Sequence, residues 1–359
     1  MTVQDSGLVV ANLMFIGKGN GSTGVYNQNG GTSQGRNGGG LYVEVGSQPF
    51  STATLNLNGG TFKARRIRSV NAGLSTVNFN GAQVVVARDG GDGVDADFLN
   101  NITVANILSG GANIDTGTND IAIAQVLGGI GGLNKTGTGT LLLNGVNTYT
   151  GNTVATGTLG GSGTIAGNVN AQSLSPGSAA GIGQLTISGN LTFSGNLSVD
   201  VATSVSPSND VIAVTGSQAH TGPGNVVVNN LGPVLQVGQK FYLFNGVLAG
   251  GAALTVTGGG ATWQNNLAAD GSIQVLTVLP APTFTPGSVA TLLDGNKSIT
   301  ATGIIGQNYR LWASTDVTLT PIISTWTLLS SGTVTASPFT INDLNATNFP
   351  NRFYIFSTP

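Results

Sequence analysis

The sequence predicts an all-β fold in which a long β-solenoid is followed by a small antiparallel β-sandwich, and three observations support this. Glycine occurs 57 times in 359 residues, about twice its usual ~7%, while Glu44 is the only glutamate. Short runs of alternating apolar and polar residues recur from Gly7 to Pro280, separated by Gly or Asn-Gly turns. Beyond Pro280 the chain becomes richer in aromatic residues. Because helix-forming residues are scarce, strands are the regular structure that this composition favours.

The composition limits the classes of function that the chain can serve. Only 26 side chains are charged, 12 basic and 14 acidic, so Asn, Thr, Ser and Gly must supply most of the polar surface. A net charge of −2, with no basic segment long enough to follow a phosphate backbone, argues against nucleic acid as a partner. The lack of cysteine excludes disulfides and thiolate chemistry. No apolar stretch reaches ~18 residues, so no membrane span is expected. The first residues also lack the basic region and apolar core of a signal peptide.

Asn-Gly pairs predict the corners of the solenoid. The segment Asn58–Thr61 repeats Asn29–Thr32, and the step from Asn58 to Asn80 is 22 residues, close to one coil of a β-helix. Glycine adopts left-handed backbone conformations freely and asparagine tolerates them, so these pairs suit the points where a strand changes face. The alternating runs between the corners include Leu55, Leu57, Val77, Phe79 and residues 84–86.

The stretch from Gly131 to Leu159 carries a longer motif. It reads GGLNKTGTGTLLLNGVNTYTGNTVATGTL and closely resembles the passenger-associated β-strand repeat of bacterial autotransporters. The matching residues are Leu133, Lys135, Gly137, Gly139, Thr140, Leu141, Asn147, Thr148, Tyr149, Gly151, Gly157, Thr158 and Leu159. The resemblance covers roughly residues 50–280. It implies a right-handed parallel β-helix, here assigned to residues 1–280, in a secreted or surface-exposed protein.

No series of membrane-barrel strands follows the repeat, which distinguishes the chain from autotransporters that translocate themselves. The sequence is more similar to long, barrel-less secreted proteins of environmental Gram-negative bacteria. The resemblance therefore implies an extracellular or cell-surface location.

The chain beyond Pro280 predicts a second domain at residues 281–359. Pro280, Pro282 and Pro286 interrupt the strand pattern, and strand-like runs then recur at about the 8 to 12 residues typical of a small sandwich. The final segment from Asn348, NFPNRFYIF, is similar to the last strand of small immunoglobulin-like or fibronectin-like modules. The aromatic residues of this domain are Trp312, Trp326, Phe339, Phe349, Phe353, Tyr354 and Phe356.

The sequence offers little for catalysis, and we expect no enzyme. His220 is the only histidine, in a Gly/Pro-flanked segment interpreted as a loop, and its nearest acidic neighbour in sequence is Asp210. Polysaccharide lyases and pectinases also use parallel β-helices, but their sites need several acids and bases on one face. The acids here are isolated, at Asp115, Asp120, Asp200, Asp210 and Asp270. A threonine ladder for ice binding lacks periodic recurrence.

One acidic cluster is a candidate calcium site, the only cofactor that the sequence suggests. Asp89, Asp92, Asp95 and Asp97 place four carboxylates within nine residues, among glycines that let the backbone curl. Calcium prefers six to eight oxygen ligands, and the cluster resembles, without matching, the EF-hand and the nonapeptide calcium repeat. The alternative is a solvated loop inserted between two coils.

The only basic run consists of Lys63, Arg65, Arg66 and Arg68. Strict alternation along a strand predicts that Arg66 and Arg68 share one face while Lys63 and Arg65 take the other. Ion pairs with the acidic segment 89–97 are favoured over contact with an anionic glycan.

The N-terminal strand pattern predicts an assembly surface. Residues 8–16 are apolar and uncharged, a poor cap for the end coil of a solenoid, whose N–H and C=O groups lack partners. The residues expected to contact a second copy, by end stacking or strand donation, are Leu8, Val9, Val10, Leu13 and Phe15. Head-to-tail contacts that do not close would give filaments.

The function expected is therefore an extracellular structural protein, a self-assembling fibre or surface-coat subunit. The alternative is the stalk and binding module of a large bacterial adhesin. In that case an exposed Trp312 or Trp326 would contact cell-surface or extracellular glycans, whereas burial of both would make them core.

Overall fold

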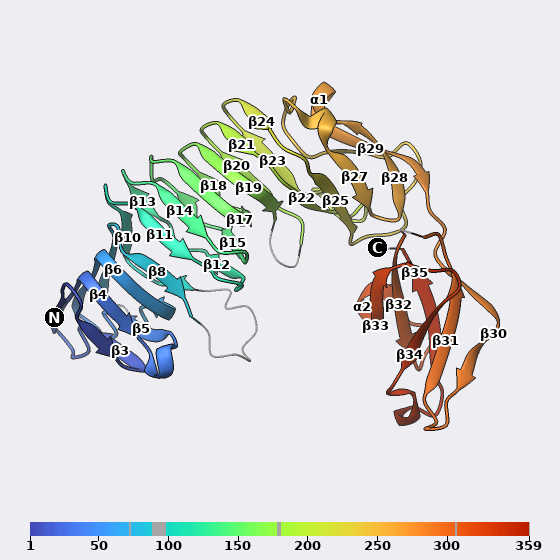
Figure 1. The fold of residues 1–359 in the computed structure, drawn as a ribbon, viewed down its shortest axis with the longest axis horizontal. Helices are drawn as coiled ribbons and strands as arrows, with labels where there is room; N and C mark the ends of the chain where they lie inside the picture. Colours follow the sequence, from blue (N-terminus) through green and yellow to red (C-terminus); the bar gives the residue numbers. More distant parts are fainter. Residues whose placement is uncertain (72, 88–97, 178–180, 306, 359) are drawn as a thin grey trace.

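The structure is a computed structural model that describes residues 1–71, 73–87, 98–177, 181–305 and 307–358. It confirms the predicted all-β class: parallel strands stack in successive coils, as in a β-solenoid, and antiparallel sheets follow, as in a small β-sandwich. Figure 1 shows the coils forming an arch that begins at the N-terminus and leads to the C-terminal domain. Among the described residues, no helix is long and apolar enough to cross a membrane.

Each coil contributes strands to three parallel ladders. The first ladder contains β1 (Thr2–Val3), β4 (Thr23–Gln34), β6 (Thr52–Arg68), β7 (Leu74–Phe79), β10 (Val104–Ile107) and β13 (Gly128–Gly129). In later coils its place is taken by β16 (Val146–Asn147), β18 (Thr164–Ile165), β20 (Gln184–Ile187) and β23 (Val211–Val214).

The second and third ladders complete the coils. The second contains β2 (Leu8–Val10), β8 (Gln83–Val86), β11 (Ala112–Asp115), β14 (Leu133–Thr136), β21 (Leu191–Phe193) and β24 (Gln218–His220). The third contains β3 (Leu13–Ile16), β5 (Leu41–Val45), β9 (Leu99–Asn100), β12 (Ile121–Ile123), β15 (Thr140–Leu143), β22 (Leu197–Val201), β25 (Asn225–Asn230) and β27 (Thr255–Gly258). Four long strands turn a corner and pair in more than one ladder: β4, β6, β17 (Thr153–Gly161) and β19 (Val169–Pro176).

The core lies inside the coils because side chains on a strand alternate between two faces. The inward residues of successive coils stack above one another: Tyr26 is aligned with Leu55, Leu55 with Val77, and Val77 with Ala105. All four are buried. The alternating pattern read from the sequence therefore marks the interior correctly.

Glycine corners separate the first ladder from the second. Gly31, Gly60 and Gly81 have positive φ values of 61°, 68° and 104°, a region that side-chain-bearing residues rarely adopt. A Cβ atom on Gly60 would also collide with the main-chain carbonyl of Gly31 in the coil before it. The structure thus confirms the corners predicted from the Asn-Gly pairs.

Asparagines run along the outside of the first ladder in a hydrogen-bonded row. The side-chain amide of Asn56 donates to Asn27 (2.7 Å), that of Asn78 donates to Asn56 (2.8 Å), and that of Asn106 donates to Asn78 (3.0 Å). Stacked amides of this kind tie each coil to the next along a parallel ladder.

Two residues of the motif between Gly131 and Leu159 are internal supports. Tyr149 is fully buried, and its hydroxyl lies 2.6 Å from Thr153 Oγ1. Burial raises the pKa of Tyr149 to about 12. Lys135 is also fully buried and donates to the carbonyls of Gly137 (2.7 Å) and Thr156 (2.8 Å). It thereby joins two successive coils from the inside.

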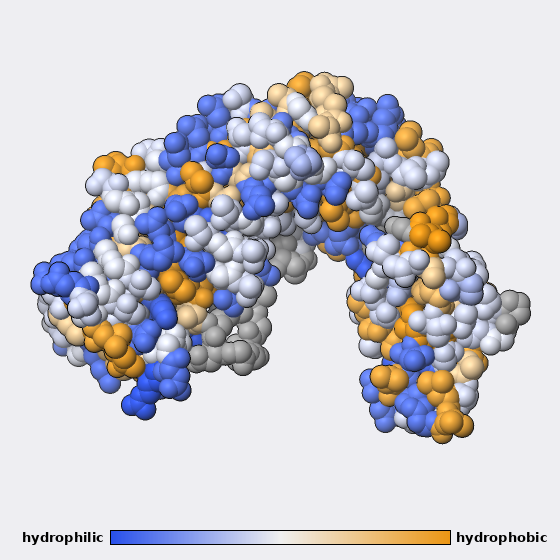
Figure 2. All heavy atoms as spheres, in the orientation of Figure 1, coloured by the Kyte–Doolittle hydropathy of each residue, from blue (hydrophilic) through white to orange (hydrophobic). Residues whose placement is uncertain are grey.

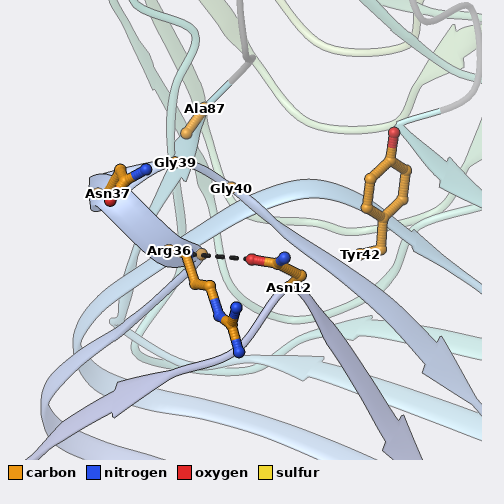
Figure 3. A pocket seen from close by; sticks show the side chains of 9 residues that line it. Asn12, Arg36, Asn37, Gly39, Gly40, Tyr42 and Ala87 are labelled. Carbon is orange, nitrogen blue, oxygen red and sulfur yellow. Dashed lines mark hydrogen bonds between the residues drawn. The ribbon is translucent and has the colours of Figure 1, made fainter.

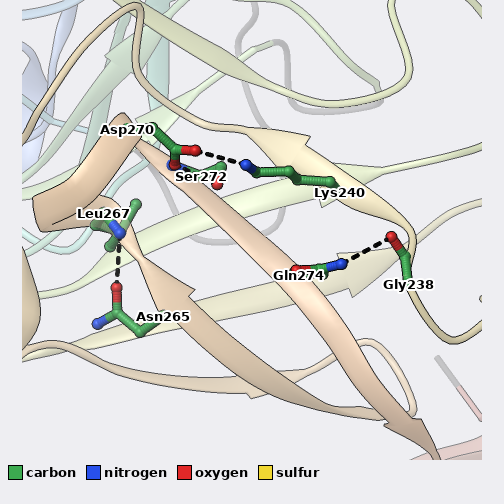
Figure 4. A network of polar contacts seen from close by, with 7 residues as sticks. All are labelled: Gly238, Lys240, Asn265, Leu267, Asp270, Ser272 and Gln274. Carbon is green, nitrogen blue, oxygen red and sulfur yellow. Dashed lines mark hydrogen bonds and ion pairs between the residues drawn. The ribbon is translucent and has the colours of Figure 1, made fainter.

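An antiparallel sheet covers the far end of the solenoid. It consists of β26 (Lys240–Tyr242), β28 (Ala261–Asn266) and β29 (Ser272–Val278), with the short helices α1 (Leu267–Asp270) and η2 (Gly251–Ala253) beside it. Phe241, Leu267 and Ile273 belong to the same core as the coils. Lys240 pairs with Asp270 at 2.5 Å (Figure 4) and links β26 to the turn before β29.

Residues beyond this sheet form two three-stranded antiparallel sheets. One contains β30 (Thr283–Thr291), β31 (Lys297–Thr302) and β34 (Phe339–Asp343), and the other contains β33 (Thr327–Thr333), β32 (Asn308–Ser314) and β35 (Phe353–Ser357). Between them lies a second core built on Ile299, Tyr309, Leu311 and Phe356. Single-turn segments, α2 (Ile322–Thr325) and η3 (Ala346–Asn348), lie in the connections, and η1 (Arg36–Gly38) precedes β5.

Candidate functional site

The first coil has exposed apolar side chains among the residues that the sequence assigns to contact with a second copy. Leu8, Val10, Leu13 and Phe15 are 62%, 48%, 46% and 37% exposed; these four residues are called the first-coil surface below. Val9 differs from the expectation because it points inward and packs against the core. Alternation along β2 places Val9 on the opposite face from its neighbours.

The strands of the first coil are paired on one side. β2 pairs with β4 and β3 pairs with β5, and within the described ranges no strand lies along their other edge. Edge strands with free N–H and C=O groups are templates for another strand. A groove of about 340 Å³ next to β3 is lined by Met14, Ile16 and Val25 together with Leu13 and Phe15. Figure 2 shows apolar residues gathered near this end of the arch.

The basic run of β6 spans the bend between the second and third ladders, and its geometry differs from the alternation that the sequence predicts. Leu41 pairs with Ala64 but Tyr42 pairs with Arg66, so a bulge at Arg65 and Arg66 shifts the register. Both arginines are partly exposed between the buried Ala64 and Ile67. The prediction that Lys63 and Arg65 face away from Arg66 and Arg68 is therefore wrong, because an extra residue interrupts the two-residue period.

The observed partners of the basic run lie in neighbouring coils. Arg68 pairs with Glu44 at 3.0 Å, and the Arg65 guanidinium lies over the Tyr42 ring, 4.9 Å from its centroid. Lys63 Nζ donates to the Gly38 carbonyl at 3.4 Å. The predicted pairing with the acidic segment 89–97 lies outside the described residues.

A polar hollow of about 510 Å³ is lined in part by Gly38 and Tyr42, which contact Lys63 and Arg65 of the basic run. Figure 3 shows the lining of this hollow. Its walls are mainly main chain from the glycine-rich segment 35–40, and Asn12 Oδ1 accepts a hydrogen bond from the Arg36 main-chain N–H at 3.3 Å. Tyr42 stands on the opposite side of the hollow. Among the described residues, its lining contains no carboxylate and no histidine.

His220 lies at the end of β24, and not in a loop as the sequence suggested. It is buried against Phe193, with ring centroids 4.8 Å apart, and its Nε2 lies 3.2 Å from the Gly195 carbonyl oxygen. The prediction failed because the glycine and proline that follow His220 obscure a three-residue strand.

Asp200 and Asp210 are brought close together. Asp210 Oδ2 accepts a hydrogen bond from the Asp200 main-chain N–H at 2.8 Å, and Asp210 Oδ1 accepts one from Gly183 N–H at 2.7 Å. Burial raises the pKa of Asp210 to about 7, and the charge of Asp200 acts in the same direction. Asp210 is only 1% exposed, so this carboxylate is out of reach of a polymeric substrate. Nothing in the sequence pattern indicated its burial.

The candidate calcium ligands Asp89, Asp92, Asp95 and Asp97 lie outside the described residues. Within the described part of the chain, no group of three or more His, Asp or Glu side chains is placed to hold a metal ion.

The two tryptophans of the C-terminal domain differ in exposure. Trp312 is buried, and its ring N–H donates to Ser357 Oγ at 2.8 Å. Trp326 is partly exposed, and its ring N–H donates to the Leu319 carbonyl at 3.0 Å. Trp312 is therefore a core residue, while Trp326 retains an accessible part.

Comparison with known proteins returned no match: no family model, no curated protein and no solved structure is similar to this chain.

Proposed function

We propose that this protein is an extracellular structural protein that assembles with copies of itself through the first-coil surface. The observation that carries the proposal is the difference between the two ends of the solenoid. The first coil exposes apolar side chains on strands with one free edge, whereas a sheet covers the core at the last coil. An exposed apolar edge is favourable only when another surface covers it.

The covered far end restricts how copies can join. The strands of the last coil are covered and cannot pair with the first coil of a second copy. The first coil of one copy therefore pairs either with an outer strand of the C-terminal sandwich of another copy or with the first coil of another copy. Contact with the sandwich is heterologous and leads to an open filament, the fibre or surface coat that we favour. Contact between two first coils closes into a pair.

The proposal includes properties that rest on the passenger-type motif. From that resemblance we infer a right-handed winding and a location outside the cell or on its surface. From the scattered positions of the acidic residues we infer that the protein has no catalytic activity. The internal positions of Lys135 and Tyr149 support a structural role for the motif residues, because side chains buried between coils cannot contact a partner.

Assembly is tested by sedimentation velocity and electron microscopy of the full chain over a range of concentrations. The double variant Leu13→Lys with Phe15→Lys places two charges on the first-coil surface and should shift assemblies to monomers. Ile130→Lys is the matched control, since Ile130 is a 72% exposed aliphatic residue between β13 and β14, away from both the first coil and the sandwich. It should assemble as the unsubstituted protein does.

Two results would contradict the proposal. A protein that remains monomeric at every concentration does not self-assemble. Assemblies that persist in the double variant would show that the contact lies elsewhere.

A second candidate function is the stalk and binding module of a larger adhesin. The partly exposed Trp326 favours it, because aromatic rings at a surface pack against the apolar faces of sugars. A glycan array probed with the full chain and with Trp326→Ala would detect binding that depends on this residue.

A further inference from the structure

A cleft of about 400 Å³ lies where the solenoid meets the C-terminal domain. It is called the junction cleft below. One wall is the solenoid segment that follows β25, and the other is the start of α2 in the sandwich. The apolar residues that line the two walls are Leu231, Pro233 and Val234 on the solenoid side, and Pro321, Ile322 and Ile323 on the sandwich side.

The walls of the junction cleft are accessible. Val234 is 63% exposed and Ile323 is 40% exposed, although both are large aliphatic residues. Apolar side chains that face one another across a gap between domains are typical of ligand sites, which are mostly apolar and often lie at domain interfaces. The cleft also falls within the usual volume range of such sites, ~300 to 1,000 Å³.

Arg310 on β32 reaches into this cleft and joins the two domains. Its terminal nitrogens donate to the Asn229 side chain (2.6 Å) and to the Asn230 carbonyl (3.2 Å), both on β25. Asn229 in turn donates to Asp200 at 2.8 Å. These contacts hold the guanidinium in place in the lining of the cleft.

Arg310 forms no direct ion pair among the described residues, and the charge of Asp200 acts on it only at longer range, across the Asn229 side chain. Both groups that accept its hydrogen bonds are neutral amides. A guanidinium carries five N–H donors, and the two bonds to β25 leave others for a ligand. A half-buried cation without an ion pair is electrostatically matched to an anion.

We propose that the junction cleft binds a small ligand with an apolar body and one carboxylate, the body lying between the two walls and the carboxylate accepting hydrogen bonds from Arg310. The ligand contacts both domains, so its binding also restrains their relative orientation. This inference goes beyond self-assembly and does not depend on the first-coil surface.

Isothermal titration of the full chain with decanoate and with 1-decanol tests the proposal. Both probes have the same number of carbons, and only decanoate is an anion. Because hydrogen bonds to charged groups contribute about 1.5–3 kcal/mol, decanoate should bind at least about tenfold more tightly than 1-decanol. Equal affinities, or no binding of decanoate, would overturn the proposal.

Two variants locate the site. Arg310→Gln removes the cation and should abolish the preference for decanoate over 1-decanol. Ile323→Ser changes an exposed wall residue and should weaken binding of both probes, without the loss of domain contact that the Arg310 variant could cause. Leu293→Ser is the control, because Leu293 is an exposed leucine outside the cleft. Unchanged decanoate binding in both Arg310→Gln and Ile323→Ser would show that the probe binds at another place.

Discussion

Replacement of Asp210 by asparagine should change the stability of the solenoid in opposite directions at acidic and at neutral pH. Burial raises the pKa of this carboxyl group from 3.8 to about 7 in the folded protein. Between these two values the folded state holds a proton that the unfolded state has released. Stability therefore decreases as the pH rises from about 4 to about 7.

The size of the effect follows from the same shift. The difference between 3.8 and about 7 corresponds to at most ~4 kcal/mol of stability lost by pH 8. An asparagine side chain carries no charge, so the variant avoids this loss. Its amide has one carbonyl oxygen for the two N–H donors of Gly183 and Asp200, and the mismatch destabilises the variant by about 1–2 kcal/mol at any pH. Asp210→Asn should thus be less stable than the unsubstituted protein near pH 3, where the loss has not yet begun, and more stable near pH 8.

Urea unfolding followed by far-ultraviolet circular dichroism at several pH values measures this crossover. Asp294→Asn is the control, since Asp294 is an exposed carboxylate in the C-terminal domain whose side chain accepts hydrogen bonds from Asn296. A difference between Asp210→Asn and the unsubstituted protein that stays constant across pH would refute the buried-carboxylate reasoning.

Further substitutions test the internal supports and the calcium candidate. Lys135→Met leaves the main-chain carbonyls of Gly137 and Thr156 without their donor and should destabilise the solenoid by about 2–4 kcal/mol in urea unfolding. Lys63→Met, on the surface, should change stability by less than ~1 kcal/mol. Asn78→Ala interrupts the asparagine row at two hydrogen bonds and should destabilise by about 1–2 kcal/mol, measured by the same method. If the acidic segment 89–97 binds calcium, calorimetric titration should show heat and chelation should lower the melting temperature; neither change would be seen for a solvated loop.

Several features of the fold could be predicted from local sequence because their cause is local. Gly60 and Gly81 mark corners since only glycine adopts their backbone conformation without strain. Leu55 and Val77 mark the interior because a strand alternates its faces over every two residues. The exposed positions of the first-coil surface and the inward position of Val9 follow from the same alternation.

Local patterns failed where one residue shifted the register or where distant segments met. The bulge at Arg65 and Arg66 depends on how β5 pairs with β6, and the strand position of His220 depends on the neighbouring coils. One of the two carbonyls that Lys135 contacts, that of Thr156, lies on the next coil, so its role as a link between coils could not be seen from its spacing. The sheet over the last coil, which restricts how copies can join, likewise had no signal in the strand pattern.

Composition, turn residues and two-residue periodicity by themselves determine that this protein is all-β, that its strands coil around a core and that its first strands carry apolar side chains. These properties depend on each residue and its nearest neighbours. The tertiary structure alone decided that Asp210 is buried beside Asp200, that one end of the solenoid is covered, and that Arg310 faces an apolar cleft between domains. Each of these depends on segments far apart in the chain, whose approach sets the burial and the charge that a side chain experiences.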